Sequence, residues 1–183
     1  MNVLKKTFSR YFRFLFCINK KDATRSVLVL LATYFTVLMF SQNYHIYLDL
    51  QERRCLTQHV FFGINLSPGD VVKKGDFVSF LGAEDVMMGL FNGKRIAKEV
   101  LAQEGDFVII NDKALYINNA LSRKMQPETL QKISDKGKKT VVLNRVLTKD
   151  EFIVAGNEQW AFDSRYWGVI KRYQIDQKVW PIL

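Results

Sequence analysis

The run Phe162-Asp163-Ser164-Arg165-Tyr166-Trp167-Gly168, near the C-terminus, is the stretch that most constrains the fold. It sets an acid, a hydroxyl and a base between aromatic residues and closes on a glycine. Upstream of it, Lys98 precedes a Gly105-Asp106 turn by seven residues. Further upstream, residues 26–48 carry no formal charge. As a helix this span would reach about 34 Å, enough to cross a hydrocarbon core of about 30 Å.

The positive charge of the chain is concentrated before this apolar span. The net charge is +9, and residues 1–25 hold seven lysines and arginines against one acid, Asp22. Such a cluster is typical of a membrane-flanking segment, so we expect no nucleic-acid partner. We predict a cytoplasmic segment over residues 1–25, an inner-membrane (cytoplasmic-membrane) anchor over residues 26–48, and a periplasmic domain over residues 49–183. A cleaved signal sequence is the alternative, but no small-x-small site follows Phe40.

Residues beyond the apolar span favour a mostly β fold. Short apolar stretches separated by turn residues predict a coiled β-sheet or partly closed barrel with short helices. The expected strands are residues 58–64, 76–81, 94–101, 107–110 and 114–118. We further predict a hairpin of residues 140–148 with 151–155, and a last strand over residues 167–172. Pro127 at a helix-entry position predicts a helix to residue 134.

Taken together, these motifs resemble the type I signal peptidase superfamily. Leu115-Tyr116-Ile117-Asn118-Asn119 and the Trp180-Pro181 end add to the resemblance. The branch most similar is the conjugative-transfer group, which processes pilin precursors. The resemblance implies an endopeptidase with a nucleophile/lysine dyad, a pilin precursor as peptide substrate, and no cofactor or metal. It leaves open whether the precursor is hydrolysed or cyclised, and whether the chain is instead an inactive homologue that assists pilus assembly.

Lys98 is the candidate general base. Its spacing to Gly105 matches the catalytic lysine of the family, which must be neutral to take a proton. A free lysine has a pKa of about 10.4, so the amine needs apolar surroundings such as Ile96 and Val100. Lys94 is the nearby competitor with the weaker spacing. Without the family pattern, a surface lysine would be the simpler interpretation.

Cys55 is the candidate nucleophile, at a position where the family usually has serine. It is followed by Leu56 and an aromatic-rich stretch, just past the apolar span. A thiol loses its proton more readily than a hydroxyl, so a Cys/Lys pair is chemically reasonable. Cys17, the second cysteine, lies on the other side of the span and cannot form a disulfide with it. Ser67 is the alternative nucleophile by its spacing to Gly75, although its Pro and Gly neighbours also predict a turn.

The resemblance assigns a supporting role to Asp163, Ser164 and Arg165. Asp163 and Arg165 are expected to form an ion pair that supports the strand that carries Lys98. Two departures from the family pattern favour the inactive alternative. Ala161 stands where many relatives have a serine that orients the lysine, and Gly156-Asn157 replaces a Gly-Asp-Asn sequence.

Overall fold

The structure is a computed structural model that describes residues 20–52, 54–84 and 87–182. It divides into two compact units, Met1–Asn43 and Tyr44–Leu183. Cys17 and most of the basic segment 1–25 lie outside the described residues. The two units are treated separately below.

The described part of the first unit is the helix α2 (Lys20–Asn43). Residues 21–43 of this helix reach a mean hydropathy of 1.7 in their strongest window. The helix is therefore long and apolar enough to cross a membrane. The hydroxyls of Thr33 and Thr36 donate to carbonyl oxygens one turn earlier, at 2.9 and 2.8 Å. These polar groups therefore have partners within the helix, as a bilayer interior requires.

The helix ends at Asn43, five residues before the end of the expected apolar span. Residues 44–48 instead form β1 (Tyr44–Leu48), which pairs with β2 (Val60–Asn65) over its whole length. The sequence of β1 alternates in exposure, the period of a strand with one face packed. Strand pairing thus takes these residues out of the helix that their apolar content suggested.

The second unit is mostly β, as predicted, and is built on a seven-stranded antiparallel sheet. Its order is β1-β2-β11-β3-β4-β9-β10, with β1 and β10 at the edges. The added strands are β3 (Phe77–Leu81), β4 (Arg95–Ala102), β9 (Glu151–Ala155), β10 (Ile170–Lys171) and β11 (Ile175–Pro181). A short 3₁₀ turn, η1 (Met87–Gly89), lies between β3 and β4, and a second, η2 (Arg172–Gln174), precedes β11.

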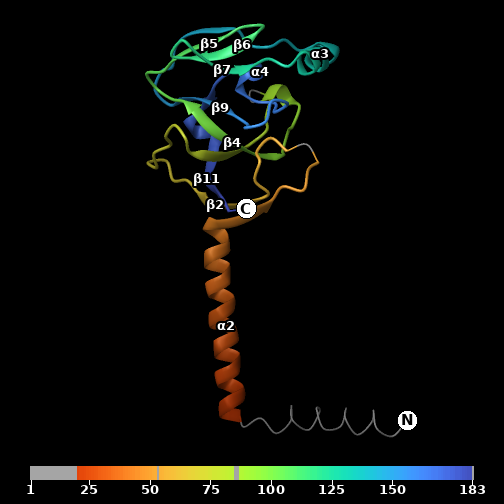
Figure 1. The fold of residues 1–183 in the computed structure, drawn as a ribbon. Coiled ribbons are helices and arrows are strands. Elements are labelled where there is room, and N and C mark those ends of the chain that lie inside the picture. Colours follow the sequence, from red (N-terminus) through yellow and green to blue (C-terminus); the bar gives the residue numbers. More distant parts are fainter. Residues whose placement is uncertain (1–19, 53, 85–86, 183) are drawn as a thin grey trace, which may run out of the picture. The chain divides into compact units, whose positions relative to one another are not determined.

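A second sheet of four strands has the order β7-β6-β5-β8. Its strands are β5 (Phe107–Ile110), β6 (Ala114–Ile117), β7 (Ala120–Lys124) and β8 (Leu143–Val146). In Figure 1, β5, β6 and β7 form a layer distinct from β9, β4 and β11. The helix α3 (Pro127–Asp135) starts at its proline as predicted, because proline lacks the N–H that a first helical position leaves unpaired.

Two Gly-Asp turns fix how β3 and β5 begin. Gly75 and Gly105 have φ of 88° and 87°, a left-handed conformation that favours glycine. In each turn the following aspartate accepts a hydrogen bond from the backbone N–H three residues before it, at 2.8 Å for Asp76 and 3.0 Å for Asp106. The second turn directs the chain from β4 in the large sheet into β5 in the small one.

Two predictions about the C-terminal half were wrong. The expected hairpin of residues 140–148 with 151–155 does not form, because β8 pairs with β5 and β9 pairs with β4 in the other sheet. Of the last strand expected over residues 167–172, only the two residues of β10 are in a strand. Residues Ser164–Trp167 form the short helix α4, which Asp163 caps, and the longest C-terminal strand is β11.

Glu151 joins the two sheets electrostatically. It is buried and accepts hydrogen bonds from Arg145 Nη1 and Nη2 at 2.6 and 3.0 Å, and from Lys171 Nζ at 2.7 Å. The Arg145 hydrogen bonds are the main reason that the pKa of Glu151 lies well below its usual value. The carboxylate therefore favours folding at neutral pH.

Replacing Glu151 by glutamine should lower the free energy of unfolding at pH 7 by about 1–2 kcal/mol, a modest value because Arg145 and Lys171 are half-exposed. A lowered folded-state pKa contributes stability above the unfolded value of about 4.3, and loses it as pH falls below that value. The gap between wild type and Glu151→Gln should therefore narrow from pH 5 downward in thermal denaturation. Glu104→Gln, an exposed control, should match wild type throughout. A gap that is constant with pH would contradict the ion-pair explanation.

Candidate active site

Lys98 lies in the middle of β4, with Val78 of β3 opposite it. Its side chain is fully buried, on the same strand face as Val100 and Ala102. Its Nζ makes no hydrogen bond to any of the described residues. A buried amine without an acceptor is rare, since burial of an unpaired ammonium is costly. Lys98 is therefore a buried amine without an acceptor among the described residues.

A cleft of about 420 Å³ opens beside this amine. Both Lys98 and Cys55 line it, so the structure brings the two predicted dyad residues to one cavity. The remaining walls are mostly apolar and come from several elements, among them Tyr47, Leu56, Phe61, Met87, Phe91, Ile96, Phe162 and Val179. Lys94 also lines the cleft, but it is exposed. Burial therefore distinguishes Lys98 from Lys94, the two lysines that the sequence offered as candidates for the general base.

The chain segment that carries Cys55 is held by the loop after β9. The backbone N–H of Glu158 donates to the Cys55 carbonyl at 3.3 Å, and Trp160 Nε1 donates to the Arg54 carbonyl at 2.9 Å. A Cβ at Gly156 would lie 2.4 Å from the Cys55 carbonyl oxygen, closer than any side chain allows. Gly156 is thus required for this close approach, and Cys55 itself is a free, half-buried thiol.

Ser67, the alternative nucleophile, lies in an exposed turn. Its backbone N–H donates to Asp70 Oδ2 at 2.7 Å, and its carbonyl accepts from Arg172 Nη2 at 2.8 Å. It is not among the residues that line the Lys98 cleft. The structure therefore places Ser67 in the turn that its proline and glycine neighbours predict, and not beside Lys98.

Asp163 and Arg165 form a buried ion pair. Arg165 Nε and Nη2 donate to the two oxygens of Asp163 at 2.8 and 2.9 Å, and both side chains are almost completely buried. Arg165 also donates to the carbonyls of Lys124 and Ala161 at 2.7 and 2.8 Å. Asp163 accepts from the backbone N–H of Gly156 at 3.2 Å. The pair thus ties α4 to β7 and to the loop that holds Cys55.

Ser164 anchors the same helix to the central sheet. Its buried hydroxyl accepts a hydrogen bond from the backbone N–H of Val154 at 2.9 Å. Val154 lies on β9, opposite Val100 of the strand that carries Lys98. Ala161, where a serine was expected from the family pattern, is buried and brings no hydroxyl.

Removal of either partner of the buried pair should destabilise the protein. Asp163→Ala or Arg165→Ala should each cost about 3–5 kcal/mol, because the remaining charge stays buried without a counter-ion. Thermal or urea denaturation measures this loss. Lys138→Ala, which breaks the exposed pair with Glu84, is the control and should cost less than about 1 kcal/mol. Unchanged stability combined with lost activity would instead give the pair a direct role in catalysis.

Two neighbouring residues with unusual backbone conformations, one of them in the cleft wall, carried no signal in the sequence. Met87 and Met88 both adopt left-handed backbone conformations, with φ of 59° and 57°, and Met87 is buried against the cleft. Left-handed conformations are uncommon outside glycine and concentrate at functional sites. Nothing in the local sequence distinguishes these methionines from core residues, so they could be found only from the backbone.

The second unit thus combines a mostly β fold with a cleft that both a buried lysine and a thiol line. The family model described as "Signal peptidase, peptidase S26" matches residues 21–182. The chain therefore belongs to the signal peptidase family, whose members are serine-type peptidases. Among solved structures, a signal peptidase I from Enterococcus faecalis is similar at 21% identity with a TM-score of 0.35, covering 58% of this chain and 94% of that one. No curated protein sequence matches this chain.

Proposed function

We propose that this protein is a single-pass endopeptidase of the inner membrane that cleaves a conjugative pilin precursor. Cys55 is the nucleophile, Lys98 is the general base, and the β domain faces the periplasm. The observation that supports this most directly is one cleft lined by both a thiol and a buried lysine amine, and no described residue accepts a hydrogen bond from that amine. The apolar walls of the cleft suit small apolar side chains next to the scissile bond.

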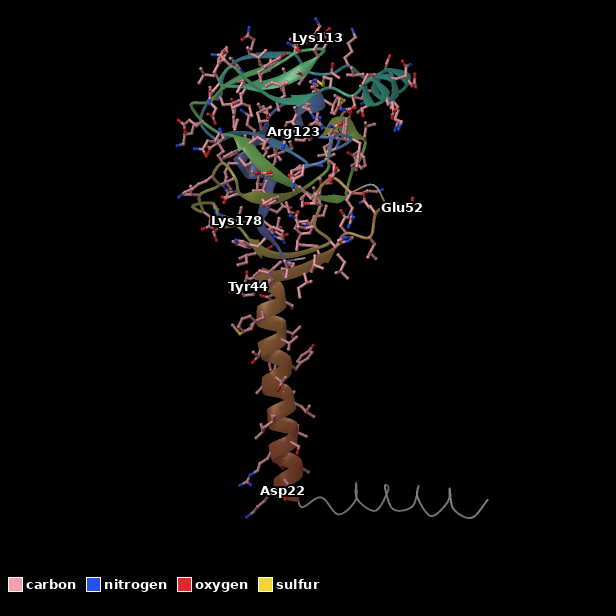
Figure 2. All side chains as sticks on the ribbon, viewed as in Figure 1. Asp22, Tyr44, Glu52, Lys113, Arg123 and Lys178 are labelled. Atoms are coloured by element: carbon pink, nitrogen blue, oxygen red, sulfur yellow. The ribbon has the colours of Figure 1, made fainter. Side chains whose placement is uncertain are left out.

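The β domain also carries a surface suited to the membrane interface. Tyr44, Ile46 and Leu48 lie on one face of β1, and Ile46 is 71% and Leu48 64% exposed. Phe62 is paired with Ile46 on one side and with Trp180 on the other, which extends this apolar face across three strands. Figure 2 labels Tyr44, the first residue after the apolar helix. Exposed aromatic and aliphatic side chains on a strand that follows such a helix in the sequence support action at a membrane surface.

The proposed chemistry has two acyl-transfer steps. The neutral amine of Lys98 takes the proton of the Cys55 thiol as Sγ bonds to the scissile carbonyl carbon. When the tetrahedral intermediate collapses, the peptide C–N bond breaks and the Lys98 ammonium returns the proton to the leaving amine. A thioester remains, and water attacks it with Lys98 again as base, which releases the acid and restores the thiol.

The same thioester is open to attack by an amine in place of water. If the N-terminal amine of the bound precursor attacks, a new amide bond forms, the thiol leaves, and the peptide becomes a circle. Thioesters react readily with amines, so a cysteine nucleophile suits cyclisation as well as hydrolysis. The two products differ in mass by one water molecule.

Co-expression with a pilin precursor tests the proposal. We expect the precursor to lose mass in the presence of this protein, and mass spectrometry of the product distinguishes the linear from the circular form. The matched control is the same strain with Lys98→Ala. A precursor of unchanged mass with wild-type protein present in the membrane would contradict the endopeptidase proposal.

The topology predicts opposite compartments for the two ends of α2. Reporter fusions after residue 25 and after residue 60 should give a cytoplasmic and a periplasmic signal respectively, because the basic residues before the span stay in the cytoplasm. Alkaline phosphatase and a cytoplasmic fluorescent protein measure the two compartments. Equal signals from the two fusions would contradict a membrane-spanning α2.

A non-enzymatic role is the second candidate, and Ala161 favours it. The serine expected there would orient the lysine, whereas the buried Lys98 amine has no hydrogen-bond partner among the described residues. In this alternative the protein binds pilin in the same cleft and assists pilus assembly without cleavage. Co-purification of an uncleaved precursor, lost on Phe91→Asp in the cleft wall, would favour this role over the peptidase.

A further inference from the structure

A second cleft, of about 390 Å³, lies between β7 and the loop that follows β9. Its charged lining residues are all basic: Arg123, Lys124 and Arg165. Arg165 is neutralised by Asp163, but neither Arg123 nor Lys124 has a salt bridge to any described residue. This cleft, called the basic cleft below, therefore carries positive charge that none of its own lining residues offsets.

Arg123 lines the basic cleft, and the described residues use only part of its hydrogen-bonding capacity. Its Nη1 donates to the Ser122 carbonyl at 2.9 Å, whereas its Nε is buried and has no acceptor in the part of the chain that the structure describes. No described residue accepts a hydrogen bond from Nη2 either. Because Nε is inaccessible, Nη2 is the donor left for a ligand, and a guanidinium N–H forms a charge-assisted hydrogen bond with a carboxylate oxygen.

We propose that the basic cleft binds the carboxylate of an acidic peptide segment. The side chains around Arg123 are neutral hydrogen-bonding groups that suit peptide N–H and C=O groups: Ser122, Gln126, Asn157 and Gln159. Leu121, half-exposed at the same cleft, adds an apolar contact for a side chain. Neutral hydrogen-bonding and apolar groups beside Arg123 and Lys124 provide contacts that a peptide can use and a bare phosphate cannot, which favours a peptide.

The loop after β9 connects the basic cleft to the candidate nucleophile. Asn157 and Gln159 line the basic cleft, while Glu158 and Trp160 hold the backbone of residues 54–55 through the hydrogen bonds described above. A peptide in the basic cleft thus contacts the loop that positions Cys55. The binding itself does not depend on the chemistry of Lys98, so it can be measured separately from cleavage.

The test is peptide binding to the detergent-solubilised full chain at physiological ionic strength. The probe is a dye-labelled acetylated tetraglutamate amide, and its dissociation constant is measured by fluorescence anisotropy. Arg123→Gln should weaken binding about tenfold, because it removes one charge-assisted hydrogen bond to the carboxylate. Lys113→Gln removes the same charge from an exposed turn at residues 111–114, apart from Arg123 in Figure 2, and should change binding less than about twofold.

Three results would overturn the proposal. One is equal binding of tetraglutamate and tetraglutamine, and another is equal loss on Arg123→Gln and Lys113→Gln. The third is Arg123-dependent binding of inorganic phosphate or of phosphatidylglycerol vesicles that displaces the peptide, which would make the basic cleft a phosphate or lipid site. Selective binding of tetraglutamate by a protein that cleaves no precursor would support the basic cleft while contradicting the peptidase proposal.

Discussion

Replacing Lys98 by alanine or by arginine should abolish precursor processing while the protein stays folded. Alanine removes the base, and arginine cannot lose its proton at neutral pH, so neither variant can activate a nucleophile. We expect a loss of more than about 100-fold, the usual contribution of a general base. Mass spectrometry of a co-expressed precursor measures processing, and circular dichroism with thermal denaturation checks the fold.

Lys94→Ala is the matched control for Lys98. Both lysines line the same cleft, but Lys94 is exposed while Lys98 is buried. The control should process the precursor at a rate near that of wild type. Arginine is the more informative replacement because it keeps a long basic side chain at residue 98. Retained activity in Lys98→Arg would exclude Lys98 as the general base and make Lys94 the next candidate.

Replacing Cys55 by alanine should also abolish processing, because no thioester can form. Cys55→Ser should keep part of the activity, since serine is the usual nucleophile of the family and fills nearly the same volume. In a Cys17→Ser background Cys55 is the only thiol, so an alkylating reagent should label it and block processing together. Intact-protein mass spectrometry measures the labelling.

Ser67→Ala is the control for the nucleophile, and this variant should process the precursor at nearly the wild-type rate. Ser67 lies in an exposed turn and does not line the Lys98 cleft. The reverse result, an active Cys55→Ala and an inactive Ser67→Ala, would falsify the Cys55 assignment and restore a serine/lysine dyad. Normal processing by both variants would place the nucleophile elsewhere.

Features that depend on neighbouring residues could be predicted from the sequence. The apolar helix follows from composition and length, although its end at Asn43 does not. The two Gly-Asp turns and the proline at the start of α3 follow from backbone conformations that few other residues adopt. Alternation along β4 predicts one face for residues 98, 100 and 102, but not that this face is buried.

Other features depend on pairings between distant residues. The strand β11 inserts between β2 and β3, with Trp180 opposite Phe62, and β8 leaves its sequence neighbour β9 for β5. The proximity of Cys55 to the Lys98 cleft depends in turn on the loop at residues 156–160, about a hundred residues further along the chain. None of these partners is visible in a local window of sequence.

The sequence by itself determined the apolar helix, the turns and the chemical types available for a dyad, because each depends on local backbone preference or composition. Only the tertiary structure decided which lysine is buried, which nucleophile shares its cavity and whether Arg123 has an ion-pair partner among the described residues. The physical reason is that burial and hydrogen-bond partners come from strand pairing and packing between distant segments. Their free energy depends on the whole set of contacts and is not a property of any short stretch of residues.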